Sequence, residues 1–489
     1  MKIPDYVKSI IEKLENNNFE AYIVGGCVRD LLLKKLPKDW DITTNALPEQ
    51  MLTIFPNARY ENVFGTVLLP LKNDKDEVEQ VVEITTYRSE QGYSDRRHPD
   101  EIKFEEKLDK DLERRDFTIN AMAIKSKVKS QKSKVDENDY ELTDFFGGQK
   151  DLQKKIIRAV GEPIDRFKED ALRMMRAVRF ACQLNFTIEE KTQRAIIKMA
   201  GGIKYIANER IRDELIKILS SDKAYDGIIM LHELKLLQYI LPELERGVGV
   251  NQNKHHIYTV FQHSVLSLKH TPSKDWRVRL ASLLHDVAKP QTKKLINNEY
   301  TFYNHDIVGA KIAKKITQRL KFANNDSEKV VGLIKNHMFY YNVGEVTEAS
   351  VRRLIVKTGE ENLKDLIDLR VADRLGSGVP KAKPYKLRHL EYMMEKVRHD
   401  PISVKMLKIN GNDLIVLLKI NPSPKIGAIL DVLLSEVLDD PKLNDKNYLN
   451  DCSLKLNELD LDQLRQQAKE KIENKKVDDD QKIKNEFWV

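Results

Sequence analysis

Asp39 and Asp41 are two carboxylates separated by a single residue, a spacing that suits metal chemistry. On a β-strand, residues i and i+2 face the same side, so we expect both side chains to point together. Adjacent carboxylates repel each other unless a cation lies between them, and Mg²⁺ bound by carboxylates and substrate phosphates fits such a pair. Taken alone, the pair is explained equally well as two exposed acids at the end of a strand.

Gly25 and Gly26 precede these aspartates and lie between an apolar segment, residues 21–24, and a helical pattern. Glycines at this place let the backbone approach a phosphate, and the first N–H groups of the following helix can bind it. A glycine pair by itself is usually a plain turn. Together with the aspartates, it predicts a site for a nucleotide and a metal ion.

The pattern Gly-Gly-x-Val-Arg-Asp at residues 25–30, followed by Asp-x-Asp-Ile at 39–42, resembles the head domain of the polymerase-beta superfamily. The resemblance is to the branch that holds bacterial-type (class II) tRNA nucleotidyltransferases and poly(A) polymerases. It implies that Asp39 and Asp41 are catalytic and hold Mg²⁺. Glu83, on a later predicted strand, is a candidate for a third carboxylate.

Residues 114–123, Arg-Arg-Asp-Phe-Thr-Ile-Asn-Ala-Met-Ala, resemble the ribose-contacting motif of the same family. The resemblance implies that Asp116 and Asn120 hydrogen-bond the sugar and that Arg115 reaches phosphate. The alternative is a helix start that Asp116 caps, and both interpretations can hold together. Residues 89–107 resemble the flexible loop of enzymes that can add the terminal A.

Residues 166–180 are rich in arginine, and their pattern predicts one continuous helix. Asp170 and Arg173 would then share a face, and together they present the acceptors and donors that reading a base edge requires. A plain ion pair within the helix is the alternative. The stretch resembles the family's Glu-Asp-x-x-Arg motif, which implies that this pair selects CTP or ATP without a template. Residues 208–215 resemble the next family motif, a helix that supports the neck.

The resemblance thus assigns ten residues to nucleotide binding: Gly25, Gly26, Arg29, Arg115, Asp116, Asn120, Asp170, Arg173, Arg176 and Arg179.

Histidines and aspartates occur further on in an order that resembles the HD phosphohydrolase superfamily, whose helical bundle holds one or two divalent metals. The residues that carry the resemblance are His263, His285, Asp286, His305, His337 and Asp373. Imidazole and carboxylate ligands suit Mn²⁺ and Ni²⁺ as well as Mg²⁺. The expected substrate is a 2′,3′-cyclic phosphate or a phosphomonoester. The alternative is a degenerate HD fold that only packs as the body of the enzyme.

The type of secondary structure expected to position these residues changes along the chain, from mixed strands and helices to helices almost alone. Residues 1–150 mix an amphipathic helix, at Val7 to Leu14, with apolar strands at 21–24, 67–69 and 81–84, whereas later residues follow helical spacing almost throughout. We therefore expect an α+β head with a small mixed β-sheet, followed by an all-α neck, an HD body and a tail. The expected boundaries are 1–150 for the head, 151–225 for the neck, 226–390 for the HD body and 391–489 for a tRNA-binding tail.

Composition limits the classes of protein that fit. The 489 residues hold 83 Lys and Arg against 76 Asp and Glu, a net charge of +7 that permits a phosphate-backbone partner without requiring one. Neither a run of about 18 apolar residues nor a signal-peptide pattern is present, so a cytoplasmic protein without a membrane span is expected. Three distant cysteines argue against a disulfide framework or a zinc ribbon.

The resemblance implies that the 3′-hydroxyl of tRNA attacks CTP or ATP, so that C, C and A are added and pyrophosphate is released. Two metals would assist, one at the attacking hydroxyl and one at the leaving phosphates. An A-adding enzyme of a split CC- and A-adding pair is the nearest alternative. A poly(A) polymerase, or an HD phosphohydrolase with a nucleotide-binding head, are further alternatives. The sequence leaves open whether the chain is a monomer or a homodimer.

Overall fold

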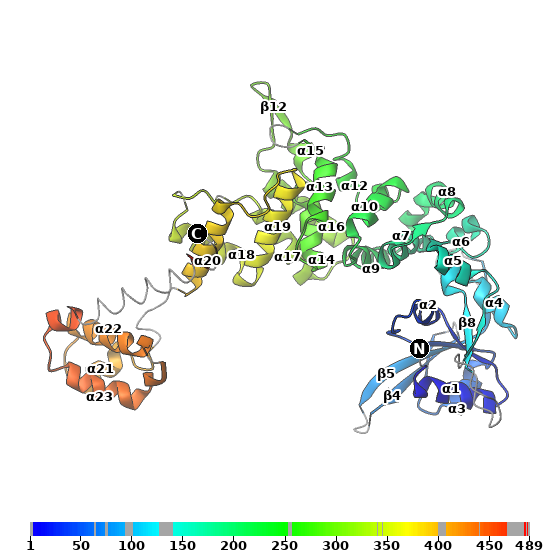
Figure 1. The fold of residues 1–489 in the computed structure, drawn as a ribbon, viewed down its shortest axis with the longest axis horizontal. Coiled ribbons are helices and arrows are strands. Elements are labelled where there is room, and N and C mark those ends of the chain that lie inside the picture. Colours follow the sequence, from blue (N-terminus) through cyan, green and yellow to red (C-terminus); the bar gives the residue numbers. More distant parts are fainter. Residues whose placement is uncertain are drawn as a thin grey trace. The chain divides into compact units, whose positions relative to one another are not determined.

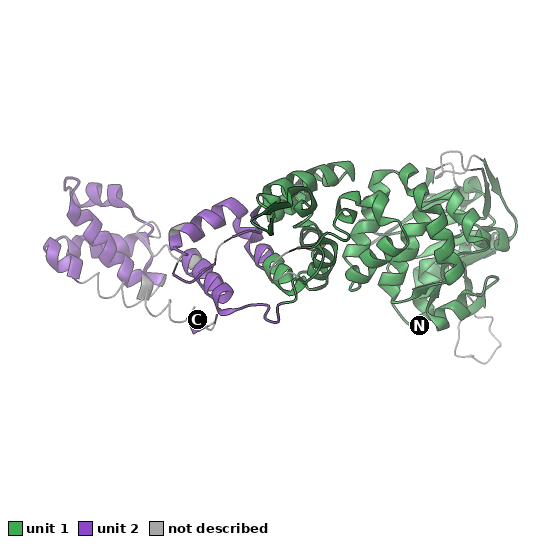
Figure 2. Ribbon diagram, turned by 90° about the horizontal axis from the view of Figure 1, so that it is seen from above, with its two compact units in different colours: residues 1–335, 368–378 green, residues 336–367, 379–489 purple. Residues whose placement is uncertain are grey.

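The computed structural model describes residues 3–62, 65–73, 77–92, 101–126, 140–252, 257–339, 341–344, 346–399, 407–439, 441–466, 484–485 and 487. The central part of the predicted loop at 89–107, residues 93–100, lies outside these ranges. So do most of the Lys- and Ser-rich residues 125–138 and most of the charged residues from 467 onward. The chain forms two units, one of residues 1–335 with 368–378 and one of residues 336–367 with 379–489 (Figure 2). Among the described residues, no helix combines the length and apolar character that crossing a membrane requires.

The head is built on a seven-stranded sheet with the strand order β3-β4-β5-β2-β1-β8-β9. Its strands are β1 (Ala21–Val24), β2 (Asp41–Thr44), β3 (Arg59–Asn62), β4 (Thr66–Lys72), β5 (Val78–Thr86), β8 (Ala123–Ser126) and β9 (Tyr140–Thr143). Neighbouring strands are antiparallel except β2 and β5, which run parallel. The sheet is therefore mixed, as expected, and its strands at 21–24, 67–69 and 81–84 are confirmed.

Helix α1 (Asp5–Asn16) buries Val7, Ile10, Ile11 and Leu14, the apolar positions that predict it. Their three- and four-residue spacing places them on one helical face. Helices α2 (Gly26–Leu32) and α3 (Pro48–Ile54) complete the first part of the head (Figure 1).

The second part of the head follows β5. It holds the hairpin β6 (Arg88–Gln91) and β7 (Glu101–Phe104), α4 (Leu108–Glu113), the 3₁₀ turn η1 (Thr118–Asn120) and α5 (Gly148–Lys154). Asp111 and Leu112 of α4 are buried, so this short helix turns one side into the head.

The neck does not contain the single helix predicted for residues 166–180. Helix α6 (Pro163–Glu169) ends before Asp170, which is extended at φ −139° and ψ 105°, and α7 (Leu172–Leu184) begins two residues later. The reason is local, because the Asp170 carboxylate accepts a hydrogen bond from the backbone N–H of Leu172 at 3.0 Å. Such a bond gives the backbone an alternative to helix continuation.

The remainder of the neck is helical apart from the two-residue strands β10 (Ile156–Ile157) and β11 (Thr187–Ile188), which pair in parallel. Its helices are α8 (Glu190–Met199), α9 (Asn208–Leu219) and α10 (Ala224–Glu233), followed by the short α11 (Leu237–Ile240) and α12 (Pro242–Glu245). Helix α9 packs along α7, so the segment predicted to support the neck does lie beside it.

The helices after the neck are α13 (Val260–Lys269), α14 (Trp276–Leu284), α15 (Lys289–Thr292), α16 (His305–Arg319), α17 (Asn324–Asn336) and α19 (Leu363–Gly376). A hairpin of β12 (Lys294–Ile296) and β13 (Glu299–Thr301) separates α15 from α16. Predominantly helical structure after residue 151 is therefore confirmed.

The second unit contains α18 (Glu348–Thr358), α20 (Tyr385–His399), α21 (Gly411–Leu418), α22 (Pro424–Asp439) and α23 (Lys446–Leu456). Leu414, Ile429, Leu433 and Leu449 form part of an apolar core among the last three helices. Helix α21 begins at Gly411, where the Asn410 side chain accepts from two backbone N–H groups.

Candidate active site and metal cluster

Three carboxylates gather at one end of the paired strands β2 and β5. Asp41 is the first residue of β2 and stands in register with Glu83 of β5, while Asp39 lies in the bend before the strand. The expected placement of both aspartates on one strand is therefore wrong, because β2 starts only at Asp41. Burial raises the pKa of Asp41, a rise that Arg115 opposes and Asp39 increases.

The same group of charges also acts on Glu83, the candidate third carboxylate. Burial raises the pKa of Glu83, and the charges of Asp41 and Asp39 raise it further. The three carboxylates therefore repel one another, which costs energy in the absence of a cation. An oxygen-only set of this kind fits Mg²⁺.

Gly25 turns the chain directly against these carboxylates. Its φ of +81° favours glycine, and a Cβ at this position would lie 3.1 Å from Asp41 Oδ2 and 3.2 Å from Arg115 Nη1. A Cβ at Gly26 would lie 3.5 Å from Arg29 Nη2. Two guanidinium groups therefore flank the glycine turn, as binding of a polyphosphate beside the carboxylates requires.

A line of contacts joins the predicted ribose-binding residues to the neck. Arg29 Nη1 donates to Asn120 Oδ1 at 3.0 Å, and Asn120 Nδ2 donates to Asp116 Oδ1 at 3.2 Å. Arg176 then donates to the other oxygen of Asp116 from Nε at 2.7 Å and from Nη2 at 2.6 Å. Burial would raise the pKa of Asp116, but Arg176 and Arg173 hold it below its ordinary value.

Asp116 does not cap a helix in the way that the alternative interpretation supposes. Its carboxylate accepts from the backbone N–H of Phe117 at 2.8 Å, and η1 begins at Thr118 without a side-chain cap. The capping interpretation is therefore wrong, and the carboxylate is committed to Asn120 and Arg176.

Asp170 and Arg173 do not pair with each other as the predicted continuous helix implies. Asp170 Oδ2 lies 2.6 Å from Nη2 of Arg210 on α9. Arg173 instead donates to Glu169 Oε2 at 2.6 Å and to the carbonyl oxygen of Arg114 at 3.0 Å. Arg210 lies in the motif at 208–215, but sequence reasoning missed its pairing with Asp170, because the two residues are 40 apart in sequence.

Arg179 faces the interior of the neck. Its guanidinium donates to Glu214 Oε1 of α9 at 2.9 Å and lies 4.2 Å from the centre of the Phe180 ring. Burial lowers the pKa of Arg179 to about 10, although Glu214 opposes that shift. The geometry shows a buried ion pair, so nucleotide binding by Arg179 stays a prediction.

Five of the six predicted HD residues meet in one buried cluster. The Nε2 atoms of His263 and His285 lie 3.1 Å apart, and they are 3.1 and 3.3 Å from Asp286 Oδ2. His305 Nε2 is 3.4 Å from the other oxygen of Asp286. Asp373 Oδ1 lies 3.3 Å from His263 Nε2 and 3.6 Å from His285 Nε2. His337 belongs to the second unit, so its part in this cluster stays a prediction.

Backbone carbonyls orient two of these imidazoles. His285 Nδ1 lies 2.8 Å from the carbonyl oxygen of Ser282, and His305 Nδ1 lies 2.7 Å from that of Phe302. A hydrogen bond at Nδ1 leaves the Nε2 lone pair for a metal, which is the usual arrangement behind ligating histidines. Imidazole nitrogens and carboxylate oxygens together fit a divalent transition metal.

Cations neutralise both aspartates of the cluster. Lys289 Nζ is 2.6 Å from Asp286 Oδ2, and Arg370 Nη1 is 2.6 Å from Asp373 Oδ2. Burial alone would lower the pKa of His285, but Asp286 and Asp373 raise it to about 10. A metal ion that binds here therefore displaces protons from the histidines.

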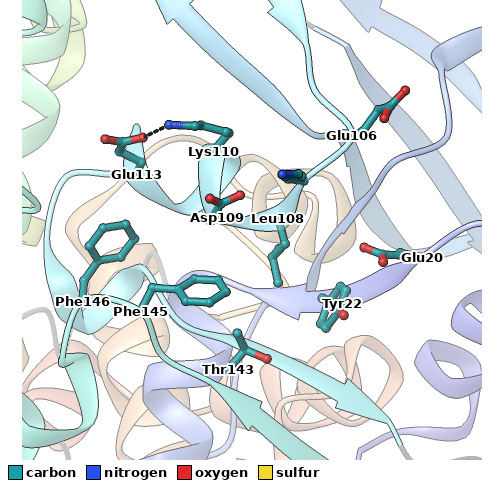
Figure 3. Close-up of a pocket in the computed structure, with 11 residues that line it drawn as sticks. Glu20, Tyr22, Glu106, Leu108, Asp109, Lys110, Glu113, Thr143, Phe145 and Phe146 are labelled. Carbon is teal, nitrogen blue, oxygen red and sulfur yellow. Dashed lines mark hydrogen bonds and ion pairs between the residues drawn. The ribbon is translucent and has the colours of Figure 1, made fainter.

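A groove of about 680 Å³ on the head contains none of the predicted site residues. Tyr22, Phe145 and Phe146 line it together with the outer side of α4, where Lys110 bonds Glu113 (Figure 3). We do not assign the nucleotide to this groove, because neither the clustered carboxylates nor the flanking arginines reach it.

Three family models match successive parts of the chain. The poly(A) polymerase head domain matches residues 21–158, and a probable RNA- and SrmB-binding site of polymerase A matches residues 185–247. The HD domain matches residues 254–378. The matches follow the order head, neck and HD body.

Two relatives cover most of the chain. The A-adding tRNA nucleotidyltransferase of Deinococcus radiodurans is 35% identical over 343 residues, which are 67% of this chain and 74% of that enzyme. The CCA-adding enzyme of Enterococcus faecalis is 32% identical over 447 residues, which are 90% of this chain and 93% of that enzyme. The chain belongs to the family of CCA-adding tRNA nucleotidyltransferases.

The crystal structure of the CCA-adding enzyme of Bacillus stearothermophilus in complex with CTP has the same fold. It aligns with a TM-score of 0.58 and 25% identity over 94% of this chain and 98% of that enzyme. The predicted family, enzyme class and fold class are confirmed. Membership in this family of nucleotidyltransferases also implies the use of divalent metal ions.

Proposed function

We propose that the protein adds C, C and A from CTP and ATP to the 3′ end of tRNA. The 3′-oxygen attacks the α-phosphorus, the bond to the β-phosphate breaks, and pyrophosphate leaves. The observation that carries the proposal is the line from Arg29 through Asn120 and Asp116 to Arg176, which links the glycine turn to the neck. The relatives named as CCA-adding enzymes support it.

Asp39 and Asp41 would hold Mg²⁺, with Glu83 beside them. Bound there, the ions would lower the pKa of the attacking hydroxyl and stabilise the departing phosphates. Arg29 and Arg115, on the two sides of the glycine turn, would bind the triphosphate.

Asp116 and Asn120 are proposed to bind the ribose. Their amide and carboxylate groups are already fixed by Arg29 and Arg176, so a sugar hydroxyl would meet oriented partners. Preorganised groups lose less freedom when a ligand binds.

Asp170 and Arg173 are proposed to select the base. Each is engaged by the protein, Asp170 by Arg210 and Arg173 by Glu169 and the Arg114 carbonyl. An incoming base would therefore exchange protein contacts for its own hydrogen bonds. A base that cannot replace them leaves partly buried polar groups unpaired, which is costly and gives discrimination.

The division at residues 150, 225 and 390 is proposed to separate head, neck, HD body and tRNA-binding tail. The glycine-bearing starts of α21 and α22 would meet tRNA phosphates. A cytoplasmic location and a monomeric or homodimeric state stay predictions.

A second candidate function rests on the HD cluster. Three imidazole Nε2 atoms lie close to Asp286, and two of them also lie close to Asp373. This arrangement favours metal-dependent hydrolysis of a 2′,3′-cyclic phosphate or a phosphomonoester. His263, His285, Asp286, His305 and Asp373, with His337, would hold Mg²⁺, Mn²⁺ or Ni²⁺.

The test of the main proposal uses tRNA that ends at the discriminator base, with CTP and ATP supplied separately and together. CTP alone is expected to give two added residues, and both nucleotides together are expected to give CCA. Addition of A only, and only to tRNA that already ends in CC, would assign the protein to the A-adding class represented by the Deinococcus relative.

A further inference from the structure

Asp111 is a fully buried carboxylate to which neither the sequence motifs nor the proposed reaction assigns a role. It lies on α4 and contacts two consecutive arginines with different oxygens. Oδ1 accepts from Arg114 at 2.6 Å from Nη2 and at 3.0 Å from Nε, while Oδ2 accepts from Arg115 Nη2 at 3.2 Å. Burial would raise the pKa of Asp111, but Arg114 and Arg115 hold it below its ordinary value.

One side of Asp111 faces the metal-binding strand. Its Oδ2 also accepts from Thr43 Oγ1 at 3.3 Å, and Thr43 follows Asp41 by two residues on β2. Arg115, held by the same oxygen, presents Nη1 to the space beside Gly25, where Asp41 Oδ2 also lies. This oxygen therefore fixes a guanidinium beside the expected phosphates.

The other side of Asp111 leads to the base-selecting residues. Arg114, held by Oδ1, is also bound by Glu90 Oε1 of β6 at 3.2 Å. The backbone carbonyl of Arg114 accepts from Arg173 Nη2 at 3.0 Å. By holding Arg114, Asp111 therefore also helps to hold Arg173, one of the two residues proposed to read the base.

We propose that Asp111 is a positioning residue that couples nucleotide selection to phosphoryl chemistry. One carboxylate sets Arg115 for the triphosphate and, through Arg114, sets Arg173 for the base. The inference rests on the proposed function of the head and neck. The competing explanation is that Asp111 only stabilises the fold. In that case, removing its charge would not change which nucleotide the protein selects.

The chain offers a matched control in Asp151. This carboxylate, on α5, is also buried and is ion-paired with Arg158 at 2.8 Å, and it accepts a hydrogen bond from Thr118 Oγ1 at 2.5 Å. None of the ten residues proposed to bind the nucleotide is among its described hydrogen-bond or ion-pair partners. Asp151→Asn is therefore expected to lower the unfolding temperature without changing kinetics.

The experiment measures steady-state addition to tRNA ending at the discriminator base, with CTP as the correct and UTP as the incorrect nucleotide. Asp111→Asn keeps the shape and removes the charge. It is expected to lower both kcat for CTP and the CTP-to-UTP ratio of kcat/KM by about tenfold or more, roughly 1.4 kcal/mol each. Asp151→Asn is expected to leave both within about twofold.

A fall in kcat and in the ratio together supports the proposal, and a change in only one of them, or in neither, overturns it. If Asp111→Asn does not fold, Arg114→Lys decides, since Lys keeps the charge but lacks the fork that joins Asp111 and Glu90. Arg114→Lys is then expected to lower the ratio, and an unchanged ratio overturns the proposal. If the wild-type protein adds no nucleotide, the proposed function itself fails, which is a separate result.

Discussion

The head–neck site and the HD cluster are both built from clustered charges, but these charges are held in different ways. In the head–neck site, partners far apart in sequence meet, such as Asp116 with Arg176 and Asp170 with Arg210. In the HD cluster, distant residues such as His263 and Asp373 meet as well, but local contacts also hold the ligands. Lys289 pairs with Asp286 at i+3, and the Nδ1 groups of His285 and His305 bond to carbonyls three residues away. Both arrangements depend on how helices or domains pack, but in the HD cluster local bonds also orient the imidazoles.

This difference separates the two proposed activities. In the head–neck site, guanidinium and carboxylate groups pair with one another, and hydrogen bonds to a nucleotide can replace these contacts one at a time. The HD cluster has imidazoles already turned toward a common point, which suits a metal. Damage to one site should therefore leave the other working.

The largest expected effect comes from replacing Asp39 and Asp41 together with alanine. Addition of CTP to tRNA is expected to fall by at least about a hundredfold, roughly 2.7 kcal/mol of barrier, because the oxygen ligands for Mg²⁺ are lost. tRNA affinity, measured by filter binding, is expected to stay within about twofold. Addition retained within about tenfold would remove these residues from the metal site.

Changes in the HD cluster should affect metal binding and hydrolysis there but not nucleotide addition. His285→Ala with Asp286→Ala removes two groups that meet at the common point, so it is expected to abolish binding of Mn²⁺ or Ni²⁺ there and any hydrolysis of 2′,3′-cyclic phosphate. Addition of CTP and ATP should stay within about threefold. Calorimetry with the metal alone, and phosphate release, measure these effects. If the wild-type protein neither binds these metals nor hydrolyses the substrate, the cluster serves only as a structural body.

A smaller effect is expected from Asp170→Ala, Arg173→Ala or Arg210→Ala. Each is predicted to reduce discrimination between CTP and UTP more than it changes tRNA affinity, because these side chains form the contacts that a base must replace. Incorporation of all four nucleotides is the measurement. Arg210→Lys serves as the control for charge. Unchanged discrimination in all three alanine variants leaves only stabilising ion pairs.

The smallest expected effect is a dependence of HD metal affinity on pH. The pKa of His285 is raised to about 10 and that of His263 is also raised, so protons compete with the metal across the neutral range. Affinity for Mn²⁺ should therefore rise as pH increases from about 6 to 9, with protons released on binding. Calorimetry in buffers of different ionisation enthalpy counts those protons. An affinity that falls over this interval contradicts the assignment of neutral imidazoles as ligands.

The sequence predicts local features of this fold well. The spacing of Val7, Ile10, Ile11 and Leu14 predicts α1, because apolar residues three and four apart line up on one face of a helix and not on one face of a strand. The order of histidines and aspartates likewise predicts the five members of the HD cluster that the first unit contains.

Long-range pairing and strand limits are harder to obtain from the sequence. Asp39 lies before β2 rather than on it, and Asp170 breaks a helix because its own side chain bonds the backbone. Arg210 and Glu214 lie in the motif at 208–215, but their pairing with Asp170, which precedes α7, and with Arg179 on α7 depends on packing.

Asp111 offers a signal that sequence analysis overlooked. It precedes Arg114 and Arg115 by three and four residues, the spacing at which helical side chains meet. An acid with two basic partners at these positions is common on exposed helices, however. Only its burial distinguishes it from an ordinary surface ion pair.

The most direct test of the central claim runs one assay on three proteins side by side. Wild type, the Asp39→Ala and Asp41→Ala double variant, and the His285→Ala and Asp286→Ala double variant receive tRNA ending at the discriminator base with CTP and ATP. We predict CCA addition by wild type and by the histidine–aspartate variant, and almost none by the double-aspartate variant. Equal extension by all three proteins, or loss of extension in the histidine–aspartate variant alone, would contradict nucleotide addition by the head and neck.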